Sequence, residues 1–355
     1  MKYILSNQEK DSGTEIIIGR DALEGLNGRV SRYTKIAVIT DEGSAASCLP
    51  ALRQVLRQEL KTVILPEGED SKSLKLAEDT LRRLQEEGFD RKSLIIGLGG
   101  GVINDIAGFV ASMYMRGIDW IMLPTTLTAQ ADAAIGGKTG VNLAGYKNMV
   151  GSFWPARAVL IDPGFLDSLP KKHLRNGLAE IIKVGFISDA NILSHVRKMN
   201  PDKLLGAELE SASELAAKAK IDIVSKDTYE AGERKLLNFG HTVGHALEAI
   251  SLTSGKPLLH GEAISVGMVA EARLAELEKV CSQGLADEVA KTLERFGLPI
   301  SYQAGTEAIM EHILSDKKNV EGNIHWTLPV KAGEGIYDHI AGDSHVRTAI
   351  ESVAG

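Results

Sequence analysis

The stretch Ser93-Leu94-Ile95-Ile96-Gly97-Leu98-Gly99-Gly100-Gly101-Val102-Ile103-Asn104-Asp105 decides the fold class of this chain. Its apolar first half is typical of a strand buried on both faces, and a helical pattern follows the three consecutive glycines. Such glycines let backbone amides approach a phosphate at a helix N-terminus, although the spacing is not the usual dinucleotide fingerprint. A tight turn that binds no ligand is the alternative.

On both sides of this stretch, similar strand patterns alternate with helical ones through the first half of the chain. The expected strands are 15–18, 35–40, 62–65, 93–97, 120–123 and 158–161, with a helix at 74–87. Alternation of this kind predicts a Rossmann-like, doubly wound parallel sheet in a domain of residues 1–170. After Pro170 the patterns become helical at 174–187, 204–224, 242–249, 263–277 and 284–296, with a possible short strand pair near 324–328. These helical patterns therefore predict that residues 171–355 form an all-α domain.

Composition narrows the functional classes. The 355 residues are 44% hydrophobic and 25% charged, with 40 basic and 47 acidic side chains for a net charge of −7. This balance is ordinary for a globular protein and predicts neither nucleic-acid nor anionic-membrane binding. The sequence contains no run of about 18 uncharged apolar residues, so no membrane span is predicted. With no signal-peptide pattern and with two widely separated cysteines, a cytoplasmic protein is expected.

A second glycine cluster, Gly136-Gly137-Lys138-Thr139-Gly140, favours an anion-binding site. Arg116 precedes it, and Lys147-Asn148 follows it. One lysine in a glycine loop is usually solvated, but several cations beside two glycine-rich loops in an acidic chain favour a phosphate site.

Histidines and a carboxylate form a candidate metal site. His241 and His245 are spaced to share one face of a helix, His260 opens the next helical pattern, and Glu180 lies in an apolar helix three residues before Lys183. Two histidines and one carboxylate suit catalytic zinc. The alternative is a helix cap and a polar cluster without metal.

Eight motifs in order resemble the 3-dehydroquinate synthase family from about residue 41 to 318. They are Gly99-Gly100-Gly101-Val102-Ile103-Asn104-Asp105, Pro124-Thr125-Thr126, Ala129-Gln130-Ala131-Asp132, Gly136-Gly137-Lys138-Thr139-Gly140-Val141-Asn142, Lys147-Asn148-Met149, Gly177-Leu178-Ala179-Glu180, Asn238-Phe239-Gly240-His241-Thr242-Val243-Gly244-His245 and His260-Gly261-Glu262-Ala263.

The resemblance implies an NAD- and zinc- or cobalt-dependent phosphorus–oxygen lyase of the shikimate pathway. It would convert 3-deoxy-D-arabino-heptulosonate 7-phosphate to 3-dehydroquinate and phosphate by transient oxidation, β-elimination, re-reduction and aldol closure. The implied metal ligands are Glu180, His241 and His260. The implied NAD contacts are Asp41, Glu69, Lys72, Gly100, Gly101, Asp105, Thr125, Thr126, Asp132, Lys138, Lys147 and Ser168. The implied substrate contacts are Arg116, Asp132, Lys138, Asn148, Lys183, Lys220, Arg234, Lys317 and Lys318, and the implied catalytic residues are Lys138, Lys183, Arg234, Asn238 and His245.

The resemblance also implies a homodimer, in which Arg116 reaches the partner's site. One departure concerns Asn104, which stands where the family usually has glycine; asparagine tolerates a positive φ, so the loop is expected to keep its shape. Three other functions stay open. They are a related sugar-phosphate cyclase acting on sedoheptulose 7-phosphate or an amino-sugar analogue, a metal- and NAD-dependent polyol dehydrogenase, and a catalytically inactive binding protein.

Overall fold

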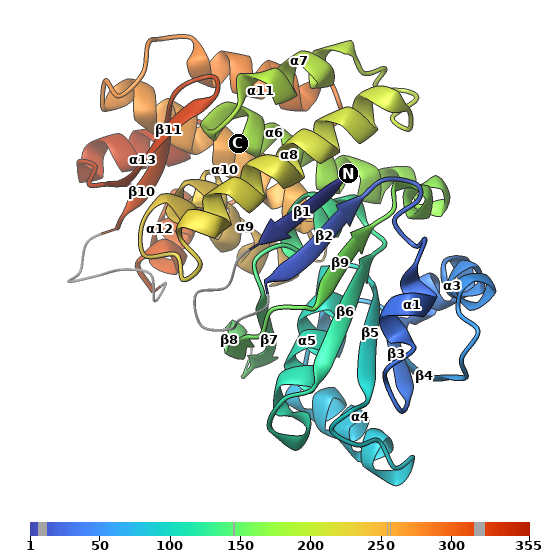
Figure 1. The fold of residues 1–355 in the computed structure, drawn as a ribbon. Helices are drawn as coiled ribbons and strands as arrows, with labels where there is room; N and C mark the ends of the chain where they lie inside the picture. Colours follow the sequence, from blue (N-terminus) through green and yellow to red (C-terminus); the bar gives the residue numbers. More distant parts are fainter. Residues whose placement is uncertain (6–12, 145, 254, 256, 316–323) are drawn as a thin grey trace. The chain divides into compact units, whose positions relative to one another are not determined.

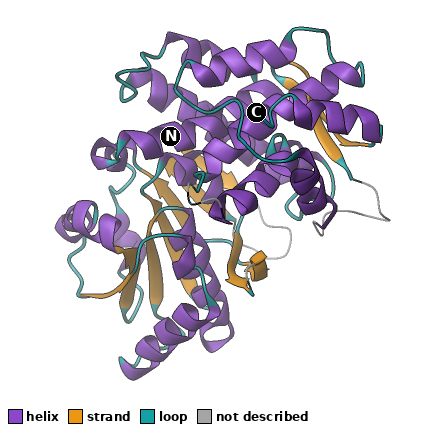
Figure 2. Cartoon of the chain, turned by 180° about the vertical axis from the view of Figure 1, so that it is seen from behind, coloured by secondary structure: helices purple, strands orange, loops and turns teal. Residues whose placement is uncertain are grey.

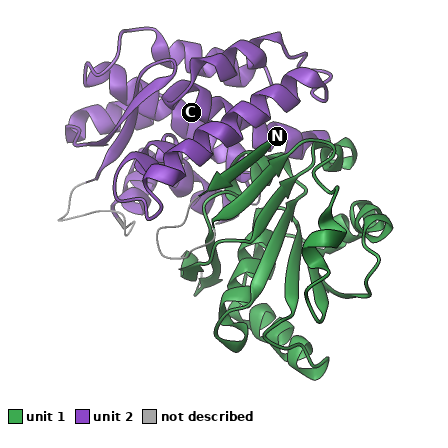
Figure 3. Cartoon of the chain, in the orientation of Figure 1, with its two compact units in different colours: residues 1–170 green, residues 171–355 purple. Residues whose placement is uncertain are grey.

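The computed structural model describes residues 1–5, 13–144, 146–253, 255, 257–315 and 324–355 (Figure 1). The chain divides into two compact units, Met1–Pro170 and Lys171–Gly355 (Figure 3). No helix within the described ranges is long and apolar enough to cross a membrane.

A seven-stranded sheet forms the centre of the first unit. Its strand order is β1-β2-β9-β6-β5-β3-β4, and every neighbouring pair is parallel except β1 with β2. The strands are β1 (Lys2–Leu5), β2 (Thr14–Ile18), β3 (Ile36–Asp41), β4 (Leu60–Leu65), β5 (Leu94–Gly99), β6 (Asp119–Pro124) and β9 (Ala158–Ile161). The doubly wound sheet and all six expected strands are confirmed. The sheet also contains β1, which was not among the expected strands.

Helices and short turns connect these strands. The helices are α1 (Leu26–Val30), α2 (Glu42–Ser47), α3 (Leu49–Val55), α4 (Leu74–Glu86) and α5 (Gly101–Met113). The turns are η1 (Glu69–Ser71), η2 (Tyr114–Arg116), η3 (Ala129–Ala133) and η4 (Pro163–Ser168). Residues of β3, β5, β6 and β9 are buried almost throughout, which explains their continuous apolar sequence.

Glycines allow close packing around the turn that joins β5 to α5. A Cβ atom on Gly99 would lie 2.6 Å from Cβ of Ile103, and one on Gly108 would lie 2.3 Å from Cγ2 of Thr139. Asn104 lies inside α5 and is not among the residues with a positive φ. The tolerance of asparagine for a positive φ is therefore not needed at this position.

The second glycine cluster is a β-hairpin rather than the loop expected from its glycines. Strand β7 (Lys138–Leu143) pairs antiparallel with β8 (Tyr146–Phe153). A Cβ atom on Gly151 would lie 2.3 Å from the Thr139 carbonyl oxygen, so this glycine lets the two backbones meet. The turn before Lys138 has Gly136 and Gly137 at positive φ, and the hairpin itself contains a register shift between Val141 and Leu143.

The second unit is mainly helical, as predicted (Figure 2). Its helices are α6 (Lys171–Ile187), α7 (Ala190–Lys198), α8 (Ala207–Lys226), α9 (His241–Thr253), α10 (His260–Leu277), α11 (Leu285–Glu294), α12 (Thr306–Ser315) and α13 (Asp343–Glu351), with the turn η5 (Glu233–Asn238). The strands β10 (Trp326–Lys331) and β11 (Glu334–His339) pair antiparallel, so the expected all-α domain also contains a two-stranded sheet. Helix α6 contacts α7, α8, α10 and η5, and α10 also contacts α9.

Candidate metal centre and surrounding residues

Three helices of the second unit bring together the three expected metal ligands. Glu180 lies on α6, His241 begins α9 and His260 begins α10. Glu180 Oε1 lies 3.1 Å from His260 Nε2 and 3.8 Å from His241 Nε2. One ligand atom from each residue lies within 4.8 Å of the others, and the Glu180 side chain is 1% exposed. A carboxylate and two imidazoles that converge in this way can hold a divalent metal.

The acceptor atoms near Nδ1 of each imidazole ring support this interpretation. His241 Nδ1 lies 3.2 Å from the carbonyl oxygen of Phe239, and His260 Nδ1 lies 3.6 Å from Glu248 Oε2. These acceptors favour a proton on each Nδ1, so each Nε2 would be the nitrogen that binds a metal ion at this site. Zinc-binding histidines in proteins use the same arrangement. The donor set therefore fits zinc or cobalt.

The electrostatics of the cluster also favour a cation. Lys183 Nζ lies 2.5 Å from Glu180 Oε2, and both side chains are buried. Burial raises the pKa of Glu180, but Lys183 and His260 outweigh that effect and hold the pKa well below its usual range. Burial lowers the pKa of His260, whereas Glu180 and Glu248 raise it to about 10. The two carboxylates thus stabilise positive charge on the His260 ring.

His245 lies beside the three candidate ligands. Its ring centroid is 5.2 Å from that of His241 and 6.1 Å from that of His260. Atoms of His245, Glu248 and His260 also lie within 4.8 Å of one another. His245 therefore borders the candidate metal centre.

The sequence interpretation did not identify Glu248. This residue follows His245 by three positions on α9, and its carboxylate faces His260. The i, i+3 spacing from His245 was the available signal, but only the position of α10 reveals the partner.

The expected substrate cations of the second unit lie on elements that contact α6. Lys220 on α8 and Arg234 on η5 are buried, at 5% and 3% exposure. Arg234 donates to the Thr228 carbonyl oxygen, and Asn238 Nδ2 donates to Glu230 Oε1 at 2.7 Å. Buried cations in a helical unit suit an anionic ligand. Lys317 and Lys318 lie outside the described residues.

In the first unit, several expected NAD contacts lie at the carboxyl ends of parallel strands. Asp41 ends β3, Gly100 and Gly101 follow β5, and Thr125 follows β6. Asp41 Oδ1 accepts from Ser44 N at 2.7 Å, and Ser44 Oγ lies 3.1 Å from Thr125 Oγ1. Ligands of open α/β sheets bind at this edge.

The remaining NAD candidates extend from this edge. Thr126 Oγ1 accepts from Ala129 N at 3.2 Å, and a Cβ atom on Gly100 would lie 3.0 Å from Thr126 Cγ2. Asp132 lies in η3, and Ser168 ends η4.

A polar network joins the residues that follow β4 to the β7–β8 hairpin. The Lys72 ammonium donates to both the Asp105 carboxylate and the side-chain amide oxygen of Asn148, and the Lys72 side chain is buried. Burial raises the pKa of Asp105, and Lys72 opposes this effect. Asn142 Nδ2 donates to Glu69 Oε1 at 2.8 Å, and its Oδ1 accepts from Asn148 N at 3.0 Å. Asn142 belongs to the second glycine-rich motif, and only the structure shows that it links Glu69 to Asn148.

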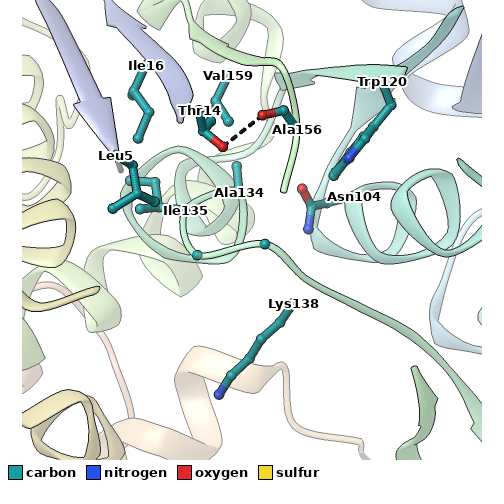
Figure 4. Close-up of a pocket in the computed structure, with 12 residues that line it drawn as sticks. Leu5, Thr14, Ile16, Asn104, Trp120, Ala134, Ile135, Lys138, Ala156 and Val159 are labelled. Atoms are coloured by element: carbon teal, nitrogen blue, oxygen red, sulfur yellow. Dashed lines mark hydrogen bonds between the residues drawn. The ribbon is translucent and has the colours of Figure 1, made fainter. Parts of the chain in front are cut away.

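The other expected cations of the first unit are exposed. Arg116 ends η2 with φ 68°, and Lys147 lies on β8. Lys138 borders a small cavity whose other lining residues include Leu5, Ile16 and Asn104. Figure 4 shows the Lys138 side chain directed away from Leu5 and Ile16, so its ammonium does not face the apolar part of this cavity.

Comparisons with known proteins agree along the chain. The model of the 3-dehydroquinate synthase N-terminal region matches residues 62–176, and that of the C-terminal region matches residues 177–319. The 3-dehydroquinate synthase of Thermodesulfovibrio yellowstonii is 40% identical over 331 residues, covering 90% of this chain and 91% of that protein. The Solibacter usitatus enzyme is 44% identical over 275 residues, covering 76% of each chain.

Solved structures share the fold at lower identity. A 2-deoxy-scyllo-inosose synthase complexed with carbaglucose-6-phosphate, NAD+ and Co2+ matches with a TM-score of 0.88 and 23% identity over 99% of both chains. A Streptomyces hygroscopicus 2-epi-5-epi-valiolone synthase with NAD+ and Zn2+ matches with a TM-score of 0.87 and 24% identity, also over 99% of both. The family models and the close relatives together establish that this chain belongs to the 3-dehydroquinate synthase family.

Proposed function

We propose that this protein is a 3-dehydroquinate synthase, a phosphorus–oxygen lyase of aromatic amino acid biosynthesis. Its substrate is 3-deoxy-D-arabino-heptulosonate 7-phosphate, and its products are 3-dehydroquinate and phosphate. Beyond family membership, the observation that carries the proposal is the convergence of Glu180, His241 and His260 beside buried Lys183. This arrangement combines a metal site with a cation in the same helical unit.

The reaction needs two bound groups whose chemistry the chain itself lacks. When bound, NAD accepts and later returns a hydride, and zinc or cobalt polarises substrate hydroxyls as a Lewis acid. Because the hydride returns, phosphate is released without net formation of NADH. Glu180, His241 and His260 would hold the metal.

Protein cations orient the substrate and stabilise its negative charge. Lys183, Lys220 and Arg234 of the second unit would bind its carboxylate, hydroxyls or phosphate, together with Asn238. His245 would hold or move a proton at an imidazole nitrogen next to the metal ligands. Lys317 and Lys318 are further candidates.

The first unit would bind NAD, and it also carries expected substrate contacts. Asp41, Gly100, Gly101, Thr125 and the residues around Lys72 provide hydrogen-bonding groups at the edge where dinucleotides bind in related sheets. Lys138, Asn148 and Arg116 would add contacts to the anionic substrate. In the proposed homodimer, Arg116 would serve the partner's site. A cytoplasmic location completes the proposal.

The test is a coupled measurement on the full chain with NAD and zinc. Phosphate release from 3-deoxy-D-arabino-heptulosonate 7-phosphate is followed together with NADH absorbance. We expect phosphate without accumulating NADH, loss of turnover on chelation and recovery with zinc or cobalt. His241→Ala should abolish turnover, whereas His195→Ala on α7 is a matched control that should keep it.

Other outcomes would assign a different function. Steady NADH formation with polyols and no phosphate release would identify a dehydrogenase. Turnover of sedoheptulose 7-phosphate or an amino-sugar analogue alone would identify another cyclase. Light scattering of the same sample measures the molar mass, and a monomeric mass would contradict the proposed dimer.

A further inference from the structure

A fully buried carboxylate, Glu271, joins the two helices that begin with the histidine ligands. Glu271 lies on α10 and is 0% exposed. Its Oε2 accepts from Gly240 N at 2.5 Å, while Oε1 accepts from Thr242 N at 3.0 Å and Val243 N at 3.2 Å. These amides belong to the N-terminus of α9, where intrahelical acceptors are lacking.

The amides bound by Glu271 flank His241. Gly240 precedes this histidine and Thr242 follows it, so one side chain of α10 holds the backbone on both sides of a candidate ligand. Helix α10 itself begins with His260, eleven positions before Glu271. Glu271 therefore ties the helix that begins with His260 to the backbone around His241.

Glycine packing leaves little freedom at this helix crossing. A Cβ atom on Gly267 of α10 would lie 2.0 Å from the Gly240 carbonyl oxygen, and one on Gly244 of α9 would lie 3.1 Å from Ile264 Cα. Gly240 has a φ of 80°, a conformation that favours glycine. The close backbone contact keeps the acceptor and its donors in register.

We propose that Glu271 is a positioning residue of the metal centre, because its carboxylate holds the start of α9 where His241 Nε2 faces Glu180. The inference rests on the metal site of the proposed function. Glu271 touches neither substrate nor metal in this role; it acts through the backbone of residues 240–243.

Replacement of Glu271 by glutamine tests the carboxylate with little change in shape. Both oxygens of Glu271 accept backbone hydrogen bonds, so either orientation of a carboxamide places an N–H2 group against a backbone N–H. Glu271→Gln should therefore displace the start of α9 whichever way the amide turns.

The same helix offers a matched control. Glu276 is 2% exposed, and its Oε1 accepts from Gly284 N at 2.8 Å and Ala286 N at 3.0 Å at the N-terminus of α11. Glu276→Gln thus removes a buried carboxylate that caps a helix without any candidate metal ligand. A general loss of stability would affect both variants, whereas a loss of metal positioning would affect only Glu271→Gln.

The experiment measures zinc and cobalt affinity of full-length protein by competition with a chromophoric chelator. Thermal unfolding of the metal-free proteins and the absorption spectrum of bound cobalt are recorded in parallel. We expect Glu271→Gln to weaken metal binding about 10- to 100-fold and to change the cobalt spectrum. Glu276→Gln should keep the wild-type affinity and spectrum.

Equal metal affinity and identical cobalt spectra for wild type and Glu271→Gln would overturn the inference. If Glu271→Gln does not fold, Glu271→Asp and Glu276→Asp provide the same comparison, because the shorter side chain keeps the charge but withdraws the oxygens. Metal affinity is read independently of turnover. Failure of the phosphate-release assay would therefore refute the proposed reaction, whereas an unchanged affinity would refute only the role of Glu271.

Discussion

Lys183 Nζ lies 2.5 Å from Glu180 Oε2, and each of these side chains is 1% exposed. The two residues are one turn apart on α6, so the ion pair belongs to the helix before any ligand binds. A buried carboxylate that loses its cation retains the cost of its burial. This relationship makes the stability of the second unit dependent on Lys183.

Lys183→Met should destabilise the metal-free protein by about 3–5 kcal/mol, because Glu180 then stays buried without its ammonium partner. Saturating zinc should reduce this loss, since a divalent cation also compensates the carboxylate. Urea unfolding with and without zinc measures both quantities. Lys172→Met, at an exposed position of the same helix, is the control and should change little. Equal destabilisation by the two variants would contradict the prediction.

Asn142→Asp should weaken NAD binding. The new carboxylate would face Glu69 Oε1, which now accepts a hydrogen bond from Asn142 Nδ2 at 2.8 Å. The repulsion should displace Glu69 from the position in which it is expected to contact NAD, and a loss of about 1.4 kcal/mol of binding free energy raises the dissociation constant of NAD roughly tenfold. Calorimetric titration measures this constant, and Asn191→Asp at an exposed position of α7 is the control. An unchanged NAD affinity with normal folding would show that the link to Glu69 has no role in cofactor binding.

Asn104→Gly should destabilise the first unit without removing an NAD contact. Asn104 is 2% exposed, and its Nδ2 lies 3.2 Å from both Asp105 Oδ1 and the Ala133 carbonyl oxygen. Loss of these bonds and of helix propensity should cost about 1–2 kcal/mol in urea unfolding. Asp79→Gly, at an exposed position of α4, reports the propensity cost alone. If both variants lose the same free energy, the amide bonds contribute nothing.

We expect the protein to lose stability in acid as the Glu278 carboxylate becomes protonated. Burial raises its pKa, but contacts with His345, Gly342 N and His339 outweigh this effect and lower the pKa below its usual value. The ionised carboxylate therefore contributes stability above its unfolded pKa of about 4.3, and this contribution is lost as pH falls through the lower folded pKa.

Glu278→Gln measures this contribution. The variant should be less stable than wild type by up to about 1 kcal/mol at pH 6, because the partly exposed His345 side chain limits the gain by solvent screening. The difference should shrink as the pH is lowered from 6 through the folded pKa of Glu278. Urea unfolding across this range is the measurement, and a difference that does not depend on pH would contradict the assigned role.

Local sequence determined the parallel sheet because buried strands are apolar along their whole length. The expected strand at 158–161 coincides with β9, and that at 62–65 falls within β4. The hairpin of β7 and β8 was not predicted, because its glycines resemble a loop and its strands are held by cross-strand pairing rather than by an apolar run. The edge strand β1 has only four residues and depends on its antiparallel pairing with β2.

Sequence motifs predict the candidate metal ligands, but they do not predict the carboxylates that orient those ligands. The spacing of His241 and His245 predicts a shared helix face, whereas the structure places His241 and His260 around Glu180 from three separate helices. Glu248 and Glu271 are ordinary acidic residues in helical sequence, and their partners lie 12 and about 30 positions away. Sequence determined which groups are available for the chemistry. Only tertiary structure decided which carboxylate orients which imidazole, because hydrogen bonds between distant segments exist only after the helices pack.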